Sequence, residues 1–134
     1  MKIKIVVLTV ILLSSISSIA QSVACVLYMK GKFLYRNEKN ELVKVERKRN
    51  HQTEINISDN TKIRRKIVWI NECSFKMYAP GVYKNQIPPA IVNLSPKTDS
   101  TFTSTCSCGM TNTTSWIIYD KNKFNRYKAS NETF

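Results

Sequence analysis

The feature that most constrains the fold of this chain is a two-residue alternation of apolar and polar side chains. Within residues 41–47, for example, Val43 and Val45 alternate with Lys44 and Glu46. Successive side chains of a β-strand point to opposite faces, so this pattern is typical of a strand with one buried and one solvated face. After the N-terminal apolar segment, no stretch repeats its apolar residues with the period of an amphipathic helix. The alternation therefore predicts a mostly β protein.

The predicted strands follow one another with polar turns between them, spaced about ten residues apart. Asparagine, aspartate and serine cluster at these turns, as in residues 58–60. Pro80, Gly81, Pro88 and Pro89 mark one longer loop, because proline cannot donate to a strand ladder. This rhythm predicts an antiparallel meander, either an open sheet or a small barrel. The predicted strands are residues 31–36, 41–47, 53–58, 63–70, 74–78, 90–94, 101–108 and 114–119.

Large apolar residues of these strands are predicted to face the interior of the sheet. In the third strand, two isoleucines alternate with Glu54 and other polar residues, so the isoleucine side is expected to be buried. If the inward residues enclose an apolar cavity, the protein carries a ligand; if they are close-packed, the sheet is a scaffold. Trp116 is expected to be buried as well. The residues on which this distinction depends are Phe33, Tyr35, Val43, Ile55 and Trp69.

The N-terminus has the organisation of a secretory signal peptide. Lys2 and Lys4 precede an apolar run over residues 5–13. This run is too short for a permanent anchor, because a membrane-spanning helix needs about 20 apolar residues. Small residues favour cleavage before Gln21. Cleavage before Cys25 is the alternative, and that cysteine would then carry the lipid of a bacterial lipoprotein.

We therefore predict a signal peptide over residues 1–20, a single β domain over 21–128 and a frayed polar tail over 129–134. The protein is expected to be secreted or periplasmic, with lipid anchoring at Cys25 as the less favoured alternative. After cleavage, the chain suits one domain with a modest core, near the size at which disulfides add needed stability.

The predicted domain contains four cysteines, Cys25, Cys73, Cys106 and Cys108. An even number in an exported chain predicts disulfides and leaves three pairings open. In a straight strand the Cα atoms of Cys106 and Cys108 lie about 6.6 Å apart, near the upper limit for a disulfide. These two cysteines therefore pair with each other only if the strand bends. The competing interpretation is a Cys3His zinc site formed by Cys73, Cys106, Cys108 and His51, but zinc ligand pairs are usually spaced more widely than this C-x-C.

Between the first two cysteines the chain contains Gly31-Lys32-Phe33, Gln52-Thr53-Glu54 and Trp69-Ile70-Asn71-Glu72-Cys73, in this order after Cys25. In this order the segments resemble a group of small exported proteins from Bacteroidetes-type bacteria. The resemblance covers residues 25–78 and implies no activity. It does imply that Cys25 and Cys73 bracket a meander of four or five strands and pair with each other.

The formal net charge of the chain is +12, and +10 without Lys2 and Lys4. Such a charge favours anionic partners: an acidic glycan, a lipid membrane surface or nucleic acid. Basic clusters at residues 44–49 and 62–66 are expected to form one patch of about four cations, because alternate side chains point apart. The alternative is that the charge only keeps the protein in solution. The residues assigned to anion binding are Lys44, Arg47, Arg49, Lys62, Arg64 and Lys66, with Lys48 and Arg65 as neighbours in the two clusters.

The only catalytic candidate is His51, with Glu54 and either Arg47 or Arg49 nearby. These residue types would supply the acid, base and phosphate clamp of a small secreted ribonuclease. They lie in one charged turn, so a solvated histidine is the preferred interpretation. No catalytic residue, metal or cofactor is assigned. The leading expectation is a non-enzymatic binding or interaction module, followed by a binder of anionic partners and then by a small hydrolase that uses His51.

Overall fold

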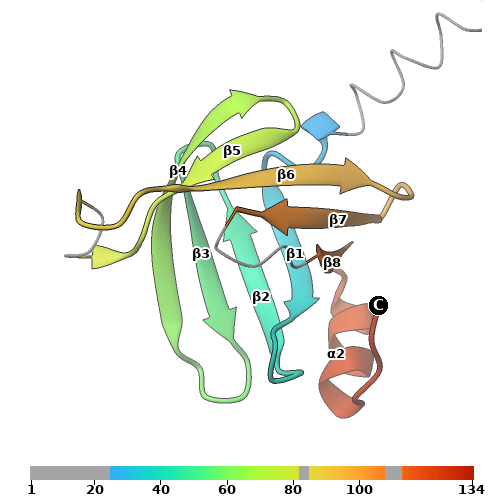
Figure 1. Ribbon diagram of the computed structural model, residues 1–134. Coiled ribbons are helices and arrows are strands. Elements are labelled where there is room, and N and C mark those ends of the chain that lie inside the picture. Colours follow the sequence, from blue (N-terminus) through green and yellow to red (C-terminus); the bar gives the residue numbers. More distant parts are fainter. Residues whose placement is uncertain (1–24, 82–84, 108–112) are drawn as a thin grey trace, which may run out of the picture.

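The structure, a computed structural model, describes residues 25–81, 85–107 and 113–134. Its eight strands follow chain order around a closed antiparallel barrel, in which β1 also pairs with β8 (Figure 1). The predicted mostly β meander is therefore confirmed, in its barrel form. The elements are β1 (Gly31–Arg36), β2 (Leu42–Arg47), β3 (His51–Asn56), β4 (Lys62–Asn71), β5 (Ser74–Met77), β6 (Ala90–Pro96), β7 (Thr101–Cys106), β8 (Thr113–Ile118) and helix α2 (Lys121–Ala129).

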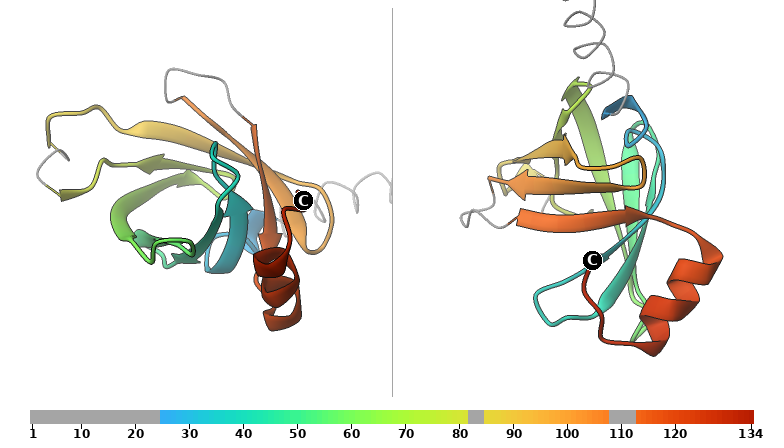
Figure 2. Two further views of the ribbon diagram at one scale, coloured as in Figure 1. Left: turned by 90° about the horizontal axis from the view of Figure 1, so that it is seen from below. Right: turned by 90° about the vertical axis from the view of Figure 1, so that its right-hand side faces the viewer.

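Because consecutive strands are antiparallel, their connections alternate between the two ends of the barrel. The β1–β2 and β3–β4 turns lie at the end drawn at the bottom of Figure 1, which we call the open end. The N-terminal turn, residues 25–30, lies at the opposite, closed end. Two further views show that β6, β7 and β8 run across the direction of β2 and β3 (Figure 2).

The turns at the open end are held by hydrogen bonds from the backbone to side chains. Asn37 Oδ1 accepts from the backbone N–H groups of Lys39 at 3.0 Å and Glu41 at 2.9 Å. Asn40 has a φ of 60°, a left-handed conformation that asparagine adopts more readily than most residues. Asn60 has the same φ in the β3–β4 turn. The turn residues predicted from the sequence therefore define the rim of the barrel.

A packed aromatic core fills the closed half of the barrel. Tyr28, in the N-terminal turn, is fully buried and stacks on Phe102 with 4.3 Å between ring centroids. Its hydroxyl group donates to the carbonyl oxygen of Thr98 at 2.7 Å, so the N-terminal turn closes this end. The buried residues inside the barrel are Tyr28, Phe33, Val43, Val45, Ile67, Phe75, Val92, Leu94, Phe102 and Trp116.

A disulfide joins Cys25, at the start of the N-terminal turn, to Cys73 in the β4–β5 turn, with 5.3 Å between Cα atoms. The pairing implied by the resemblance is confirmed, and strands β1 to β4 lie between the two cysteines. The lipid-anchored alternative at Cys25 is wrong, because the sulfur atom that would carry the lipid is in the disulfide. The predicted signal peptide and its first cleavage site lie outside the described residues. Within the described residues, no helix is long and apolar enough to cross a membrane.

Helix α2 is the main element that the sequence did not predict. Asp120 caps its N-terminus by accepting from the backbone N–H groups of Asn122 at 2.9 Å and Lys123 at 3.1 Å. The helix lies on the outside of the barrel (Figure 2). Its Phe124 and Tyr127 pack against apolar residues there. The buried residues of this outer cluster are Leu34, Leu42 and Ile117.

The predicted fraying of residues 129–134 is wrong. Arg36 donates to three carbonyl oxygens of the C-terminal segment, those of Tyr127 at 2.8 Å, Ser130 at 2.8 Å and Glu132 at 2.6 Å. The ring of Phe134 also packs edge-on against that of Tyr127, with 4.6 Å between centroids. These contacts hold the tail near the open end.

Strand β3 is oriented opposite to the prediction. Val45, which is fully buried in the barrel, stands opposite Glu54, so Glu54 faces inward and Ile55 faces outward beside Lys44. The physical reason is that arginines inside the barrel need partners, which Gln52 and Glu54 supply. The prediction for the tryptophans is only partly confirmed: Trp116 is buried, but Trp69 is half-buried.

Candidate functional site

A charged residue, Arg47, lies inside the aromatic core and is only 2% exposed. Its guanidinium carbon lies 5.0 Å from the ring centroid of Phe33, 5.1 Å from that of Phe75 and 5.5 Å from that of Trp116. The faces of aromatic rings attract cations, so these three rings partly replace the water that the guanidinium loses. The prediction that Arg47 belongs to a surface patch is therefore wrong.

Hydrogen bonds fix the guanidinium of Arg47. Its Nη1 donates to the carbonyl oxygen of Tyr28 at 2.7 Å, and its Nε donates to Gln52 Oε1 at 3.0 Å. Its Nη2 has no hydrogen-bond partner among the described residues. Burial lowers the pKa of Arg47 to about 10, so its side chain still carries a positive charge at neutral pH.

A chain of polar side chains continues from Arg47 along the inner wall. Gln52 Nε2 donates to Glu54 Oε1 at 3.2 Å. The other carboxylate oxygen of Glu54 accepts from Arg65 Nε at 3.2 Å, which forms an ion pair. Both side chains of this pair are largely but not fully buried, with 24% of Arg65 and 15% of Glu54 exposed.

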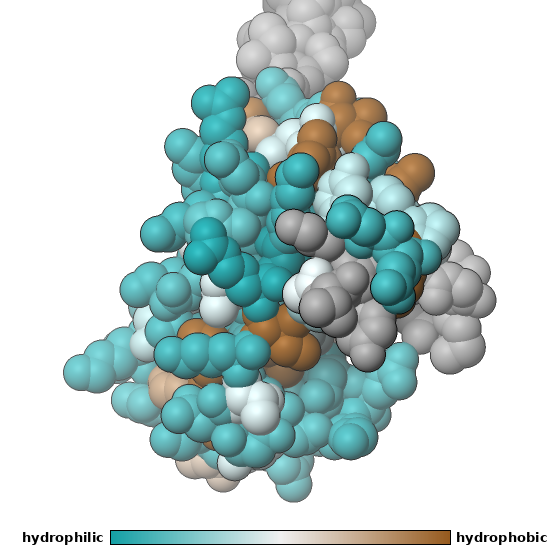
Figure 3. Space-filling view, turned by 90° about the vertical axis from the view of Figure 1, so that its left-hand side faces the viewer, coloured by the Kyte–Doolittle hydropathy of each residue, from teal (hydrophilic) through white to brown (hydrophobic). Residues whose placement is uncertain are grey.

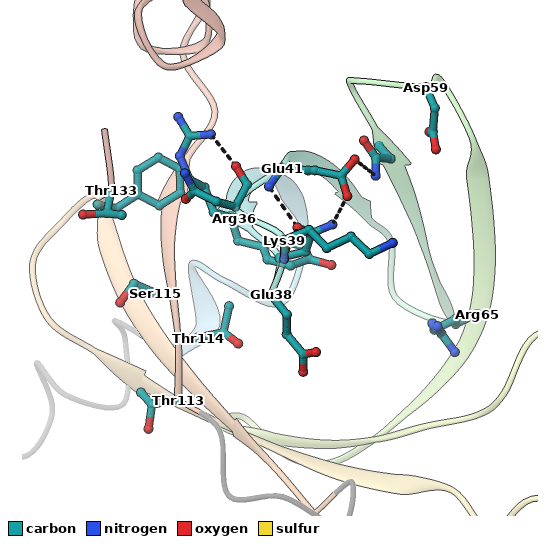
Figure 4. A pocket seen from close by; sticks show the side chains of 15 residues that line it. Arg36, Glu38, Lys39, Glu41, Asp59, Arg65, Thr113, Thr114, Ser115 and Thr133 are labelled. Atoms are coloured by element: carbon teal, nitrogen blue, oxygen red, sulfur yellow. Dashed lines mark hydrogen bonds between the residues drawn. The ribbon is translucent and has the colours of Figure 1, made fainter. Parts of the chain in front are cut away.

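A cavity of about 1030 Å³ opens at the end of this chain, at the open end of the barrel (Figure 4). Figure 4 shows Glu38 and Thr114 pointing into it and Arg65 at its side. Amide, hydroxyl and charged groups provide much of the lining, and Tyr35 and Phe134 contribute rings. The lining residues are Tyr35, Arg36, Asn37, Glu38, Lys39, Asn40, Glu41, Asn56, Asp59, Arg65, Thr113, Thr114, Ser115, Thr133 and Phe134.

Tyr35 connects the cavity to the core. Its ring packs on that of Trp116 with 4.4 Å between centroids, and Trp116 Nε1 donates to Ser104 Oγ at 2.7 Å within the core. Burial, with a smaller contribution from the Glu54 carboxylate, raises the pKa of Tyr35. The phenol therefore stays neutral, and one wall of the cavity is a fixed aromatic ring.

The residues expected to enclose an apolar cavity do not do so together. Phe33 and Val43 belong to the packed core, and Ile55 faces outward. Of the five, Tyr35 alone lines the cavity, and Trp69 does not. The closed half of the barrel is thus a packed scaffold, while the open half provides a hollow with mixed polar and aromatic walls.

Two carboxylates at the cavity entrance are held by residues of the β1–β2 and β3–β4 turns. Glu41 accepts from Asn37 Nδ2 at 3.3 Å, Asn56 Nδ2 at 3.2 Å and Ser58 Oγ at 2.5 Å. These hydrogen bonds, led by that from Ser58, lower the pKa of Glu41, so the carboxylate stays ionised. Asp59 similarly accepts from the side chain and backbone of Thr61 in the β3–β4 turn. Both carboxylates therefore already have donors before any ligand arrives.

The remaining predicted anion-binding residues lie outside the barrel. The exposed residues Lys62, Arg64 and Lys66 occupy alternate positions on the outer face of β4, and we call them the basic stripe. Lys44 lies two strands away, 3.7 Å from Glu46 and 4.6 Å from the Tyr119 ring centroid. The surrounding surface is largely hydrophilic, with small apolar areas (Figure 3). The exposed residues Lys48 and Arg49 lie in the β2–β3 turn, whereas Arg65 faces inward.

The proposed catalytic set is not brought together. His51 lies on the outer side of β3, opposite Lys66, whereas Glu54 and Arg47 point into the barrel. Partial burial lowers the pKa of His51, and the nearby cations of Arg64 and Lys48 lower it further. His51 therefore lacks the carboxylate partner that the sequence had placed beside it.

The cysteines exclude the zinc interpretation. Cys25 and Cys73 are bonded to each other, and Cys106, at the end of β7, is also disulfide-bonded. A Cys3His site would need Cys73 and Cys106 as thiolates, and neither is available as one. Cys108 lies outside the described residues.

Comparison with known proteins finds no relative: no protein-family model, no curated protein and no solved structure matches this chain. The resemblance to small exported proteins of Bacteroidetes-type bacteria therefore stays a prediction. The function has to be inferred from the barrel itself.

Sequence reasoning missed the residues that give the interior its polarity. The predicted strand 53–58 has Glu54 on its solvated face and does not include Gln52, and Arg65 belongs to a predicted basic cluster. The sequence signal that could have revealed them is Arg65. It stands between Ile63 and Ile67 at alternate positions of β4, on the side of the strand that faces inward. Such an arginine needs an acceptor from a neighbouring strand.

Proposed function

We propose that this protein is an exported, non-enzymatic binding module that takes a small ligand at the open end of its barrel. The observation that carries the proposal is the cavity of about 1030 Å³ beside Tyr35 and Arg65. Ligand sites are usually hollows of about 300–1,000 Å³ with a few fixed polar groups. An eight-stranded barrel is wide enough either to be filled by side chains or to hold one small ligand.

The unequal packing of the two halves supports this proposal. The closed half holds Tyr28, Phe33 and Phe102 in mutual ring contact and provides rigidity. In the open half, Tyr35 and Arg65 are half-buried and line the cavity. Tyr35 is fixed by its contact with Trp116, and Arg65 by its ion pair with Glu54. A rigid scaffold that presents a few fixed polar groups is what selective binding needs.

Export is supported by the cysteines. The Cys25–Cys73 disulfide and the disulfide-bonded Cys106 fit an oxidising compartment, outside the cell or in a periplasm. The N-terminal sequence supports the same location through its predicted signal peptide over residues 1–20.

The proposal is tested with three fluorescent probes of one scaffold: dansylglycine, which is anionic, dansylglycinamide, which is neutral, and dansylcadaverine, which is cationic. At least one is expected to bind with increased, blue-shifted emission. Thr114→Phe, which places a ring in the cavity, should weaken that binding at least about tenfold because the volume is occupied. Thr53→Phe, on the outer side of β3, is the control and should leave it unchanged. Binding of none of the probes, or binding that Thr114→Phe leaves intact, contradicts the proposal.

A second candidate function is binding of an anionic polymer on the outer wall, and the basic stripe favours it. Its three cations stand at alternate positions of β4, and the ion pairs found among the described residues do not include them. At one end of the stripe, Arg64 and the nearby Lys48 add to the burial that lowers the pKa of His51. Such a surface binds polyanions without sequence preference, and the affinity falls steeply with salt.

Heparin chromatography across a salt gradient tests this candidate. Arg64→Glu with Lys66→Glu should elute at clearly lower salt than Lys121→Glu with Lys123→Glu, which makes the same change of net charge on α2. Equal elution of the two double variants would mean that only net charge matters and that the stripe is not a site.

A further inference from the structure

The inner wall of the barrel carries an unequal number of positive and negative side chains. Among the described strand residues, the charged side chains at inward positions are Arg47 of β2, Glu54 of β3 and Arg65 of β4. Two guanidinium groups therefore share one carboxylate. The interior keeps an excess of one positive charge.

The hydrogen bonds show how the single carboxylate is divided. Glu54 Oε2 accepts from Arg65 Nε, while Glu54 Oε1 accepts from Gln52, whose own side-chain oxygen accepts from Arg47. Glu54 thus contacts Arg65 directly and Arg47 only through Gln52. The Arg65 contact goes through Nε, so its terminal N–H groups are not used in a bidentate pair with Glu54.

The two arginines differ in what can reach them. Arg47 is enclosed by the rings of Phe33, Phe75 and Trp116, and its unpartnered Nη2 lies where solvent does not reach. Arg65 lines the cavity with a quarter of its side chain exposed. The excess positive charge of the inner wall favours an anion in a partly dry site, and Arg65 is the guanidinium that a ligand can contact.

We infer that the ligand of this cavity is a small organic anion whose carboxylate pairs with Arg65 while its body lies against the Tyr35 ring. This inference rests on the proposed function and adds the charge and the orientation of the ligand. Thr114 offers a hydroxyl group to the rest of the molecule. Three acidic residues also line the cavity from its turns. Neighbouring donors already engage the carboxylates of Glu41 and Asp59. Glu38 points into the cavity, but it is exposed and is followed in the chain by Lys39, a lining residue of opposite charge.

The three dansyl probes, in the unmodified protein and in three variants, test the inference. Dansylglycine should bind at least about tenfold more tightly than dansylglycinamide, because a charge-assisted hydrogen bond is lost in the neutral probe. Arg65→Gln should remove this preference and leave dansylglycinamide unchanged. Arg64→Gln makes the same charge change at the next residue, which faces outward, and should leave the preference intact.

The third variant, Glu54→Gln, tests whether the affinity for dansylglycine rises when the partner of Arg65 is removed. Glu54→Gln removes the carboxylate that competes for Arg65 and keeps a side chain that can hydrogen-bond to Gln52, so dansylglycine should bind several-fold more tightly. The two members of one ion pair should therefore change the affinity in opposite directions. A merely structural pair would lower it in both variants, and circular dichroism and thermal unfolding of each variant identify that case.

Three results would overturn the inference: equal binding of dansylglycine and dansylglycinamide, equal losses from Arg64→Gln and Arg65→Gln, or tightest binding of the cationic probe. In each of these cases the proposed function still stands if Thr114→Phe blocks binding. Binding that Thr114→Phe does not affect removes the proposed function itself, so the two failures are distinguishable.

Discussion

The disulfide between Cys25 and Cys73 should supply a large part of the stability of this small barrel. We predict the effect of replacing both cysteines by serine. In the chain-entropy account, closing a loop of n residues lowers the entropy of the unfolded chain by about 2.1 + 1.5R ln n cal/mol/K. With a sequence separation of 48, this is about 14 cal/mol/K, or about 4 kcal/mol at 25 °C. Such a loss lowers the melting temperature of a domain of this size by about 15 °C.

The assay is urea unfolding of the double variant and the unmodified protein, followed by far-ultraviolet circular dichroism and by tryptophan fluorescence. Substitution is preferable to a reducing agent, because reduction would also open the disulfide of Cys106. If the bond acts on the unfolded chain, the midpoint should fall while the dependence on urea becomes steeper, since the unfolded variant exposes more surface. The two probes should give coincident transitions.

A different result would indicate a different cause. The disulfide also anchors the turn that carries Tyr28, whose carbonyl oxygen accepts from Arg47. If its main effect is to hold this turn in the folded state, the variant should show a separate early transition and faster amide exchange at Tyr28, with an unchanged main midpoint. That outcome, or a loss below about 1 kcal/mol, would refute the loop-entropy reasoning.

Further predictions concern the core, the cavity wall and the tail. Trp116→Phe and Ser104→Ala should each cost about 1–3 kcal/mol in urea unfolding, because each leaves a buried partner unpaired, and the double variant should cost less than their sum. Burial raises the pKa of Tyr35, so the folded state keeps the phenol proton while the unfolded state loses it above pH about 10. The free energy of unfolding should therefore fall as pH rises beyond that value, and Tyr35→Phe should reduce this pH dependence. Arg36→Gln removes three hydrogen bonds to the C-terminal segment and should speed amide exchange in α2 at least about tenfold while the barrel midpoint stays nearly constant; an unchanged exchange rate would contradict this.

The strands were predictable because their signal is local. Alternation over residues 31–36 and 41–47, with turn-forming asparagines between them, matches β1 and β2 almost to the residue. Closure into a barrel was not predictable in this way. It depends on β1 meeting β8, a pairing of Tyr35 with Trp116 that no local pattern specifies.

Helix α2 was missed because it is an isolated helix with little apolar surface. Over Lys121–Ala129, only Phe124 and Tyr127 pack on the barrel, and two residues do not establish a helical period. The usable sign was Asp120, a helix-capping residue directly before a segment without glycine or proline. The helix forms because its two rings cover Leu34 and Ile117, which would otherwise be exposed on the outer wall.

The orientation of β3 shows why the candidate site could not be read from the sequence. Apolar residues were assumed to face inward, and this assumption fails where a barrel keeps a polar interior. The decisive residues are Arg47 and Arg65, which take inward positions on the strands at either side of β3 and require Gln52 and Glu54 between them. Ile55 is displaced outward by this requirement.

The adjacent residues Arg64 and Arg65 also show that strand position decides which side chains reach the candidate site. They are identical and adjacent, yet Arg64 stands in the exposed basic stripe and Arg65 forms an ion pair beside the cavity. The strand register alone assigns one to the outer wall and the other to the candidate binding site. Net charge therefore says little about function in this protein, and the comparison of Arg64→Gln with Arg65→Gln separates the contribution of charge from that of position.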